Sequence, residues 1–505
     1  MPFPSTASLA AAERRLSLAP PAARRSAEVL TLRARRPKVL FVTPESSDFL
    51  QAGGLGAVSA SLPRALNREC EARLLLPGYP AAVHSGKHVE IVAHLPAAGA
   101  IPPCSIGKMT LPDGLEVYLV LCAELYERPG SPYGDPQGLE FADNDIRFAR
   151  LSLAAAEIAE LGEGGWRPDV VHVNDWPAAL TAGYLKWRGF DTPTVLTIHN
   201  LAHQGQFEAS RLADLCIPES AFGIDGVEFY GRISFLKAGL SYAAHVTTVS
   251  ESYAEEITRR EFGCGLEGLI ALRRQEGRLT GILNGIDKSW DPRQDKRCPY
   301  LLDPQRWKGR YADFIRGAFG LTLSRAPLFA FIARLAHQKG VDLVIEASER
   351  IVELGGQLVV IGRGEPEVER EVAALASRYP EAVGARIGFD ASEARALFAA
   401  ADFLLMPSRF EPCGLSQMFA QRFGALPIAH RTGGLAETID HGVTGLLIER
   451  AETDDLVAAI DVAFDIYASP REFQAMRRAA MAKTFDWENS ASQYGALYRK
   501  VARVR

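Results

Sequence analysis

The most informative stretch of the chain reads Pro407-Ser408-Arg409-Phe410-Glu411-Pro412-Cys413-Gly414-Leu415-Ser416-Gln417. The apolar run before it, residues 403–406, is bounded by turn residues and predicts a buried parallel strand. Apolar residues recur at helical spacing after it and predict a helix over about residues 414–422, with Pro412 in its first turn. The stretch is therefore predicted to lead from the carboxyl end of a strand into a helix, where ligands bind in open α/β sheets.

The chemistry of this turn suits a polar ligand. The amides of Cys413, Gly414 and Leu415 would be unpaired donors at the positive end of the helix. Glu411 places a carboxylate at the edge of these donors, where it can hold hydroxyl groups and stabilise nearby positive charge. The alternative is a carboxylate that only caps its own helix, and this turn alone does not decide between the two.

The composition is that of an ordinary globular protein. The chain has 505 residues, of which 47% are apolar and 23% charged, and its length suggests two large domains or more. A net charge of −5 offers no basic excess for a phosphate backbone, so nucleic acid is not an expected partner. No apolar run reaches the roughly 18 residues of a spanning helix, so no membrane partner is expected either.

Seven cysteines are scattered along the chain without a C-x-x-C pair. This is typical of a reducing compartment and argues against both a disulfide framework and a zinc site, so no metal is expected. Residues 1–36 are rich in Ser, Ala, Pro and Arg and are interpreted as a disordered N-terminal extension. A bacterial, cytoplasmic protein is favoured over the alternative, a plastid protein with a transit peptide.

From residue 38 onward the pattern is regular. A first strand at 38–43 is followed by the turn Gly53-Gly54-Leu55-Gly56 and a helical pattern, an arrangement that can cradle a phosphate. Further strands are predicted at 72–76, 116–121, 170–173, 195–198 and 246–249, with helices at 146–161 and 178–188. This alternation predicts a doubly wound, mostly parallel sheet.

A second series of the same kind begins near residue 327. Its predicted strands lie at 328–333, 358–361, 386–388, 403–406 and 427–429, and its helices at 341–354, 365–377 and 391–400. We therefore predict α/β architecture with two Rossmann-like domains, 37–283 and 284–486, that face a cleft holding the site.

A pair of cations follows the first strand of the second series. Arg334 and Lys339 stand five residues apart in Arg334-Leu-Ala-His-Gln-Lys339-Gly340, on the sheet edge predicted for Glu411. A diphosphate leaving group needs such charges, because negative charge builds on it as the bond breaks. The alternative is a solvated turn with ordinary surface charges.

Further glycine turns belong to the same edge. Thr432-Gly433-Gly434-Leu435 follows the strand at 427–429, and Gly362 and Gly364 mark the end of the strand at 358–361. Several such turns on one edge of one sheet favour a nucleotide-diphosphate site.

Two strands of the first series end in polar residues. Asp175 closes Val-His-Val-Asn-Asp175-Trp176, and His199 closes Leu-Thr-Ile-His199-Asn200. A histidine at a strand end is more often a core or capping residue, but this one stands beside Asn200 and opposite the predicted anion site. We therefore interpret His199 as a ligand-binding residue.

These motifs together carry a family resemblance. The sequence resembles the bacterial glycogen synthase and plant starch synthase family, which are retaining glycosyltransferases of the two-Rossmann GT-B type. The matching stretches, in family order, are Leu125-Tyr-Glu-Arg-Pro-Gly-Ser-Pro-Tyr133, Asp175-Trp176, His199-Asn200-Leu-Ala-His-Gln-Gly205, Ser234-Phe-Leu-Lys-Ala-Gly239, Leu283-Asn-Gly-Ile-Asp287, Arg334 to Gly340, Ser408 to Leu415 and Arg431-Thr-Gly-Gly434.

The resemblance implies ADP-glucose as donor and co-substrate, an α-1,4-glucan such as glycogen as acceptor, retention of configuration and no cofactor. It also implies that a last helix, within 487–505, crosses back to the first domain. The oligomeric state stays open.

The resemblance also implies roles for individual residues. Arg334 and Lys339 neutralise the departing ADP, and Glu411 lies against the transferred glucose. Asp175 matches a carboxylate near the reacting carbon. The remaining implied substrate contacts are Tyr133, His199, Asn200 and Asn284 around the sugar and acceptor, the amides of Cys413, Gly414 and Leu415 on the sugar hydroxyls, and Thr432, Gly433 and Gly434 at the phosphates.

These residues fit a front-face mechanism. The leaving phosphate would take the acceptor proton, while Glu411 and Asp175 steady an oxocarbenium-like transition state. A double displacement, which needs a nucleophilic carboxylate behind the anomeric carbon, is left open.

The first-domain motif departs from the family pattern. The family reads K-x-G-G-L-x-D-V, whereas this chain has Gln51 and Ala57 around Gly53 and Gly54. A positive charge and a carboxylate are therefore missing from the donor side. This leaves two alternatives to a glycogen synthase: a GT-B relative with another donor or acceptor, and a weakly active glucan-binding regulatory homologue.

Overall fold

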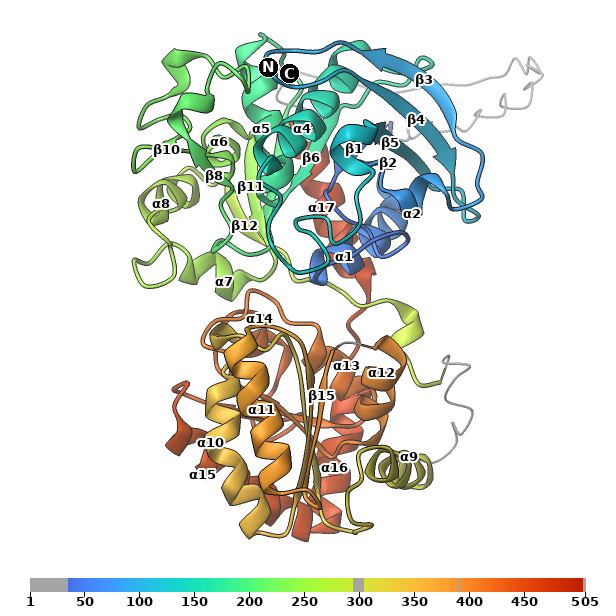
Figure 1. Ribbon diagram of the computed structural model, residues 1–505, viewed down its shortest axis with the longest axis vertical. Coiled ribbons are helices and arrows are strands. Elements are labelled where there is room, and N and C mark those ends of the chain that lie inside the picture. The colour runs from blue at the N-terminus through green and yellow to red at the C-terminus, as the bar shows by residue number, and fades with distance from the viewer. Residues whose placement is uncertain (1–34, 294–303, 389, 503–505) are drawn as a thin grey trace, which may run out of the picture. The chain divides into compact units, whose positions relative to one another are not determined.

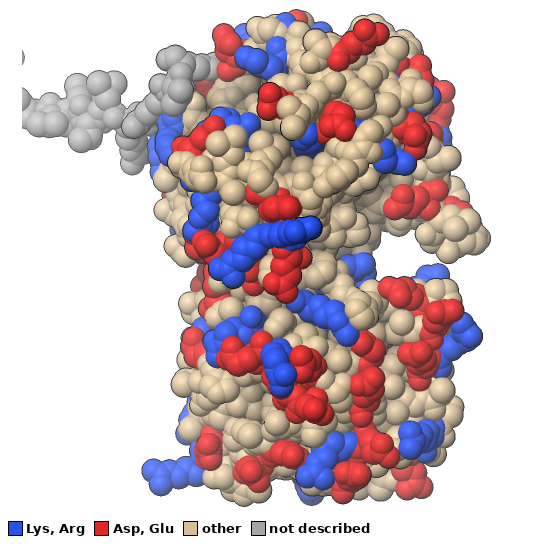
Figure 2. All heavy atoms as spheres, turned by 90° about the vertical axis from the view of Figure 1, so that its left-hand side faces the viewer, with Lys and Arg blue, Asp and Glu red and all other residues tan. Residues whose placement is uncertain are grey.

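A computed structural model describes residues 35–293, 304–388 and 390–502 of the chain (Figure 1). Residues from Arg36 onward belong to one compact unit. The extension predicted over residues 1–36 lies outside the described residues except for its last two. Figure 2 shows acidic and basic side chains interspersed over one face of the molecule.

The first sheet has the strand order β12-β11-β7-β6-β1-β2-β5-β4-β3. Its pairs are parallel from β12 to β5, whereas β4 and β3 join antiparallel at one edge, which the sequence reading did not predict. The strands are β1 (Lys38–Val42), β2 (Glu71–Pro77), β3 (Glu90–Leu95), β4 (Cys104–Thr110), β5 (Glu116–Leu121), β6 (Val170–Asn174), β7 (Thr194–Ile198), β11 (His245–Thr248) and β12 (Leu279–Gly281).

Helices and a small ribbon complete this part of the fold. The helices are α1 (Gly54–Ala65), α2 (Pro80–Val83), α3 (Ala123–Tyr126), α4 (Asn144–Leu161), α5 (Asp175–Trp187), α6 (Phe235–Tyr242), α7 (Glu251–Glu256) and α8 (Glu267–Gln275). A separate sheet pairs β8 (Gln206–Glu208), β10 (Arg232–Ser234) and β9 (Glu228–Phe229) in that order.

The second sheet is parallel, with the order β15-β14-β13-β16-β17-β18. Its strands are β13 (Leu328–Ile332), β14 (Gln357–Gly362), β15 (Val383–Ile387), β16 (Phe403–Met406), β17 (Leu426–His430) and β18 (Leu446–Ile448). Its helices are α9 (Pro304–Ala318), α10 (Val341–Glu353), α11 (Pro366–Arg378), α12 (Ala391–Ala400), α13 (Ser416–Arg422), α14 (Gly433–Thr438), α15 (Thr453–Ala468) and α16 (Pro470–Ala482).

The central strands are apolar along their whole length because helices cover both faces of each sheet. All five residues of β13 and all four of β16 are buried. The predicted α/β class, two doubly wound parallel-sheet domains, is confirmed.

The last helix, α17 (Trp487–Ala502), packs against the first sheet although it follows the second in sequence. Figure 1 shows this red helix among the blue and green elements. The rings of its Tyr494 and Tyr498 pack at tilted angles against His172 of β6, and the Tyr498 hydroxyl lies 2.7 Å from His172 Nδ1. The end of the chain is thereby built into the core of the first sheet.

Local predictions fail at three places. Helix α13 begins at Ser416 rather than near residue 414, so Pro412 is not in its first turn, because Gly414 takes a left-handed φ of 69° and turns the chain once more. Strand β15 spans Val383–Ile387, so it begins and ends earlier than the strand predicted at 386–388. Asp175 does not end β6 but begins α5, at a φ of 55°.

No helix within the described residues is long and apolar enough to span a membrane.

We predict that Tyr498→Phe destabilises the protein by about 1–3 kcal/mol, because it leaves the buried His172 Nδ1 without its partner. Urea unfolding followed by far-UV circular dichroism measures this. Tyr467→Phe is the matched control, since its hydroxyl donates to Arg325 O at the surface, and it should change stability by less than about 0.5 kcal/mol. Equal losses in both variants would contradict the role given to the buried contact.

Candidate active site

The carboxylate of Glu411 is buried and paired at the carboxyl edge of the second sheet. Lys339 Nζ donates to Glu411 Oε2 at 2.6 Å, and Ser408 Oγ donates to the same oxygen at 3.1 Å. Glu411 is 6% exposed, so the ion pair is well shielded from water. Lys339 and Glu411, which are 72 positions apart in the sequence, therefore form one ion pair.

A close backbone approach makes this pair possible. Lys339 is followed by Gly340, which has a φ of 67°. A Cβ atom at position 340 would lie 2.2 Å from Pro407 O, so only glycine lets the 334–340 turn pack on the 407–411 turn.

Arg334 lies on the same turn but points to a different partner. Its Nη2 donates to Gln338 Oε1 at 3.0 Å, and its side chain is exposed. Gln338 in turn donates to Phe410 O, which ties this turn to Glu411's neighbour. The two predicted cations thus differ: Lys339 is already paired with a carboxylate, whereas Arg334 faces solvent.

The turn at 413–415 keeps its amides open. Within the described residues, the amides of Cys413, Gly414 and Leu415 donate to no protein acceptor, while Gln417 Nε2 ties down the carbonyls of Cys413 and Gly414. The three amides therefore remain available as donors, and their predicted role in holding sugar hydroxyls stays a prediction.

The amides of Gly433 and Gly434, predicted to contact phosphates, both have protein acceptors in this structure. Gly433 N donates to Glu256 Oε1 at 2.8 Å, Thr432 Oγ1 donates to the same oxygen at 3.0 Å, and Gly434 N donates to Glu411 O at 3.1 Å. Both amides therefore have protein acceptors, so a phosphate could reach Gly433 N only by displacing Glu256.

The absence of a side chain at Gly433 and Gly434 has a separate structural reason. A Cβ atom at Gly433 would lie 2.0 Å from Glu411 O, and one at Gly434 would lie 2.2 Å from Cys413 O. The two glycines let this turn pack directly on the backbone that carries Glu411.

Asp175 and His199 meet at the carboxyl edge of the first sheet. Asp175 Oδ1 accepts from His199 N at 2.7 Å and from Asn200 N at 3.4 Å. His199 Nε2 lies 3.0 Å from Asn174 Oδ1. The carboxylate thus fixes the backbone after β7, and Asn174 fixes the imidazole ring.

Burial shifts the titration of both groups. Burial, with a smaller contribution from the charge of Glu45, raises the pKa of Asp175 to about 7, against the two amide hydrogen bonds. Burial lowers the pKa of His199 to about 3, so its ring is neutral at physiological pH. Asp175 is therefore poised to change charge near neutrality, while His199 can act only as a neutral hydrogen-bonding group.

Asn284 lies close to Cys413. Burial raises the pKa of the Cys413 thiol to about 12, partly opposed by hydrogen bonds from Asn284. Asn284 is 6% exposed, and its Oδ1 has no hydrogen-bond partner within the described residues. An acceptor therefore remains open beside the donor turn.

The glycine turn of the first sheet lies against the second-sheet turn. Helix α1 begins at Gly54 with Gly53 as its N-cap, and a Cβ atom at Gly54 would lie 3.8 Å from Leu415 Cδ1. Gln51, which replaces the family's lysine, is exposed at the start of this turn. The predicted donor-side loop and the Glu411 turn are thus neighbours.

The sequence analysis did not single out two carboxylates of the site, Glu45 and Glu256. Glu45 stands three residues after β1 and accepts from the amides of Ala52 and Gly53, and Glu256 at the end of α7 accepts from Gly433 N. The position of Glu45 just after a central strand is a signal that could have found it, because ligand-binding residues gather there. Nothing in the sequence near Glu256 marks its partner 177 positions away.

Comparison with known proteins agrees with this geometry. Residues 38–272 match the family described as starch synthase catalytic domain, and residues 326–465 match glycosyl transferases group 1. Glycogen synthase 1 of Bradyrhizobium diazoefficiens is 52% identical over 461 residues, which cover 90% of this chain and 100% of the relative. Glycogen synthase of Pseudomonas syringae pv. syringae is 50% identical, covering 93% of this chain and 97% of the relative.

The chain belongs to the glycogen synthase family.

Solved structures extend the comparison. The catalytic domain of starch synthase IV from Arabidopsis thaliana, bound to ADP and acarbose, superposes with a TM-score of 0.81 at 29% identity and covers 93% of this chain and 100% of that chain. A sucrose-phosphate synthase from Thermosynechococcus elongatus gives a TM-score of 0.57 at 19% identity over 93% of this chain and 100% of that chain, which shows the shared GT-B fold alone. The resemblance found in the motifs is confirmed at the level of family and fold.

We predict that Asp175→Asn raises the thermal midpoint more at pH 8 than at pH 5. The folded-state pKa of about 7 lies above the ordinary 3.8, so the stability that goes with the protonated carboxyl is lost as pH rises through 7. Asn keeps the accepting oxygen without the buried charge, and its advantage should grow by roughly 2 °C or more between the two pH values. Differential scanning calorimetry of both proteins, with the surface variant Asp461→Asn as control, tests this, and an advantage that shrinks with pH would contradict it.

Proposed function

We propose that this chain transfers glucose from ADP-glucose to the non-reducing end of an α-1,4-glucan such as glycogen, with retention of configuration. The carrying observation is the buried Lys339–Glu411 pair beside the open amides of residues 413–415, in a family member about half identical to glycogen synthases. A hexosyltransferase needs both a cationic place for the leaving diphosphate and a carboxylate at the sugar, and this turn cluster offers both.

In the proposed reaction, Arg334 and Lys339 meet the phosphates of the donor. The exposed Arg334 would make first contact, and the diphosphate would then share Lys339 with Glu411. As the glycosidic bond breaks, negative charge grows on the departing ADP, and fixed cations stabilise that charge more in the transition state than in the ground state.

The sugar would lie between the two carboxyl edges. Glu411 on one side and Asp175 on the other would steady positive charge on the anomeric carbon, while the amides of Cys413, Gly414 and Leu415 hold hydroxyl groups. The neutral ring of His199 can form hydrogen bonds to the sugar without competing for the proton. The leaving phosphate would take the acceptor's proton on the same face, which gives retention.

We propose no cofactor, with ADP-glucose acting as a co-substrate, because Arg334 and Lys339 would supply positive charge at the leaving group. We also place the reaction in a bacterial cytoplasm, a proposal supported by the bacterial origin of the similar glycogen synthases.

A second candidate is a relative with another donor. The specific observation in its favour is Gln51, which brings no charge to the glycine turn. Arg64 of α1 does not compensate, because it is paired with Asp48 and Asp113.

A donor panel decides between them. The wild-type protein is incubated with glycogen and, in turn, ADP-glucose, UDP-glucose and GDP-mannose, and nucleoside diphosphate release and labelled glucan are measured together. We expect ADP-glucose to be the best donor, with both products in equal amounts. Release of another diphosphate at a higher rate would replace the proposed donor.

We predict that Glu411→Ala and Lys339→Ala each lose activity by about 10²–10³-fold, because each removes charge that acts on the transition state. Steady-state kinetics with ADP-glucose and glycogen measure this. Lys483→Ala is the matched control, since Lys483 pairs with Asp440 at 2.8 Å outside the site, and it should keep full activity. Near-normal turnover of a folded Glu411 or Lys339 variant would reject these assignments.

We predict that Gln51→Lys raises kcat/KM for ADP-glucose up to about 10-fold, because a charge-assisted hydrogen bond to phosphate is stronger than a neutral one. Gln51→Met, which fills a similar volume without donating, is the control and should lower kcat/KM or leave it unchanged. A flat or lower rate with lysine, together with a better alternative donor for the wild type, would show that the loop is adapted to that donor.

A further inference from the structure

Glu45 is a buried carboxylate that the reaction proposed above does not use. It follows β1 in the loop that leads to the glycine turn, and only 2% of its surface is exposed. Within the described residues it forms no ion pair. A buried carboxylate without a cation is costly, so its hydrogen-bond partners show what it contributes.

Its two oxygens hold two different segments. Glu45 Oε2 accepts from Ala52 N and, at 3.2 Å, from Gly53 N, which is the N-cap of α1. Glu45 Oε1 accepts from the Tyr133 hydroxyl at 3.4 Å. One carboxylate therefore joins the donor-side glycine turn to Tyr133.

The glycine turn has little freedom once it is held in this way. Ser47 N donates to Gly56 O at 2.9 Å, closing the loop at its base. A Cβ atom at Gly56 would lie 2.4 Å from Gln51 Cβ and 3.3 Å from Glu45 Oε2, so the chain packs tightly around the carboxylate.

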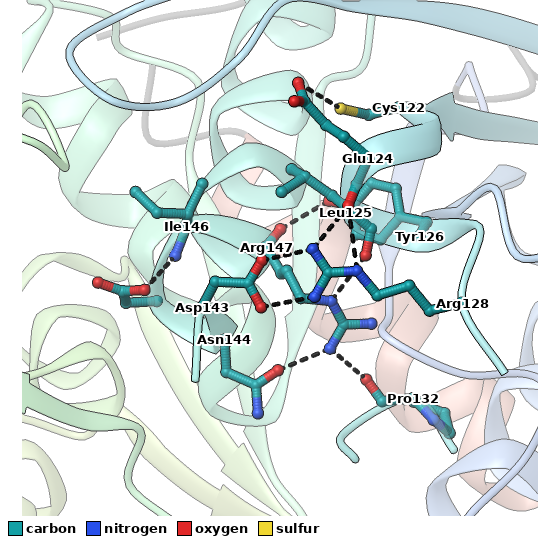
Figure 3. Close-up of polar contacts among 11 residues, drawn as sticks. Cys122, Glu124, Leu125, Tyr126, Arg128, Pro132, Asp143, Asn144, Ile146 and Arg147 are labelled. Carbon is teal, nitrogen blue, oxygen red and sulfur yellow. Dashed lines mark hydrogen bonds and ion pairs between the residues drawn. The ribbon is translucent and has the colours of Figure 1, made fainter. Parts of the chain in front are cut away.

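Tyr133 is fixed from its other side by a buried arginine. Figure 3 shows Arg147 of α4 reaching the backbone of the 125–133 segment: it donates to Leu125 O and Pro132 O, both at 2.9 Å, and to Asn144 Oδ1 at 2.6 Å. Asn144 Nδ2 in turn donates to Tyr133 O at 2.9 Å.

A second arginine braces the same segment. Arg128 binds both oxygens of Asp143, at 2.8 and 2.7 Å (Figure 3). The backbone of Tyr133 is therefore held by α4 and its cap, and the hydroxyl end is held by Glu45.

Within the part of the chain that the structure describes, the groups that face Glu45 are acidic or neutral. The titratable groups that interact with it there are Tyr133, Tyr79 and Asp175. Burial raises the pKa of Glu45 to about 7, although the two amides and Tyr133 oppose the shift. Glu45 and Asp175 are thus two neighbouring carboxyl groups whose pKa values both lie near 7.

We propose that Glu45, in its ionised form, is a positioning residue that aligns the glycine turn at 52–54 with Tyr133 for binding of the nucleotide sugar. This inference rests on the proposed function and adds a residue to it. Hydrogen bonds from two amides to a charged oxygen are stronger than those to a neutral one, so loss of the charge loosens the turn. Because Gly54 lies against Leu415, a loosened turn also disturbs the donor side of the Glu411 cluster.

Glu45→Gln is the decisive variant, since Gln keeps the shape and mimics the protonated acid. At pH 8 we expect kcat/KM for ADP-glucose to fall roughly 10-fold in Glu45→Gln and roughly 100-fold in Glu45→Ala, mainly through KM. The wild-type kcat/KM should fall more steeply than that of Glu45→Gln as pH drops from 8 to 6, because protonation of Glu45 adds a loss of up to about 10-fold to the loss from Asp175. In Glu45→Gln the loss from Asp175 remains.

Two further measurements separate positioning from simple stabilisation. The thermal midpoint of Glu45→Gln at pH 8 should equal or exceed that of the wild type, because the stability tied to the protonated carboxyl is lost above pH 7. In a double-mutant cycle, Tyr133→Phe should lower kcat/KM for ADP-glucose by a smaller factor in the Glu45→Gln background than in the wild type. The reason is that the two residues share one contact.

Glu157→Gln is the matched control, since this buried carboxylate is paired with Arg150 at 2.7 Å away from the turn. It should lower the thermal midpoint and leave kcat/KM and its pH slope unchanged. An active wild type with a Glu45→Gln variant of equal kcat/KM, or of unchanged pH slope, would overturn this inference. A wild type that transfers no glucose from ADP-glucose would instead overturn the proposed function.

Discussion

Close backbone packing at glycine holds the second half of the site together. Three turns at the carboxyl edge of the second sheet meet at Glu411, and they touch through Gly340, Gly433 and Gly434, where a single added carbon would collide with a carbonyl oxygen. The ion pair between Lys339 and Glu411 depends on this packing, because its two partners come from different turns. The glycines therefore position the ion pair indirectly, because they let the backbones of the turns approach each other closely.

The buried carboxylates at the two sheets differ in the groups that stabilise their charge. Glu411 is buried with a lysine, which offsets the cost of burying its charge. Burial instead raises the pKa of Glu45 and of Asp175 at the first sheet to about 7, and among the described residues amides and a tyrosine hydroxyl stabilise their charge. One edge of the site thus holds its carboxylate by an ion pair, while the other holds its carboxylates by hydrogen bonds.

Reciprocal carboxylates link the elements that carry these two edges. Glu256 at the end of α7 accepts from Gly433 N, and Glu437 of α14 accepts from Ser252 N. Ser250 Oγ also donates to Pro412 O at 2.6 Å, next to Glu411. The segment around α7 is therefore linked to the turn that holds Glu411, although neither Glu256 nor Glu437 belongs to a recognisable motif.

The sequence alone determined the α/β class, most of the parallel strands and the family. Continuous apolar runs between helical patterns can form little else than buried parallel strands, and the motif order from Tyr133 to Gly434 is specific to one family. It also placed Glu411, Lys339, Asp175 and His199 at strand ends, because local pattern shows where a strand stops. The tertiary structure decided how these residues are paired, for three physical reasons.

Lys339 neutralises Glu411 because two turns cross at Gly340, a contact between residues far apart in the chain. The amides of Gly433 and Gly434 already have acceptors because the fold brings Glu256 of α7 and Glu411 O within hydrogen-bonding distance of them. Glu45 joins the site because burial and the fold of one loop bring its carboxylate to Ala52, Gly53 and Tyr133, and burial depends on the whole packed chain rather than on any local stretch.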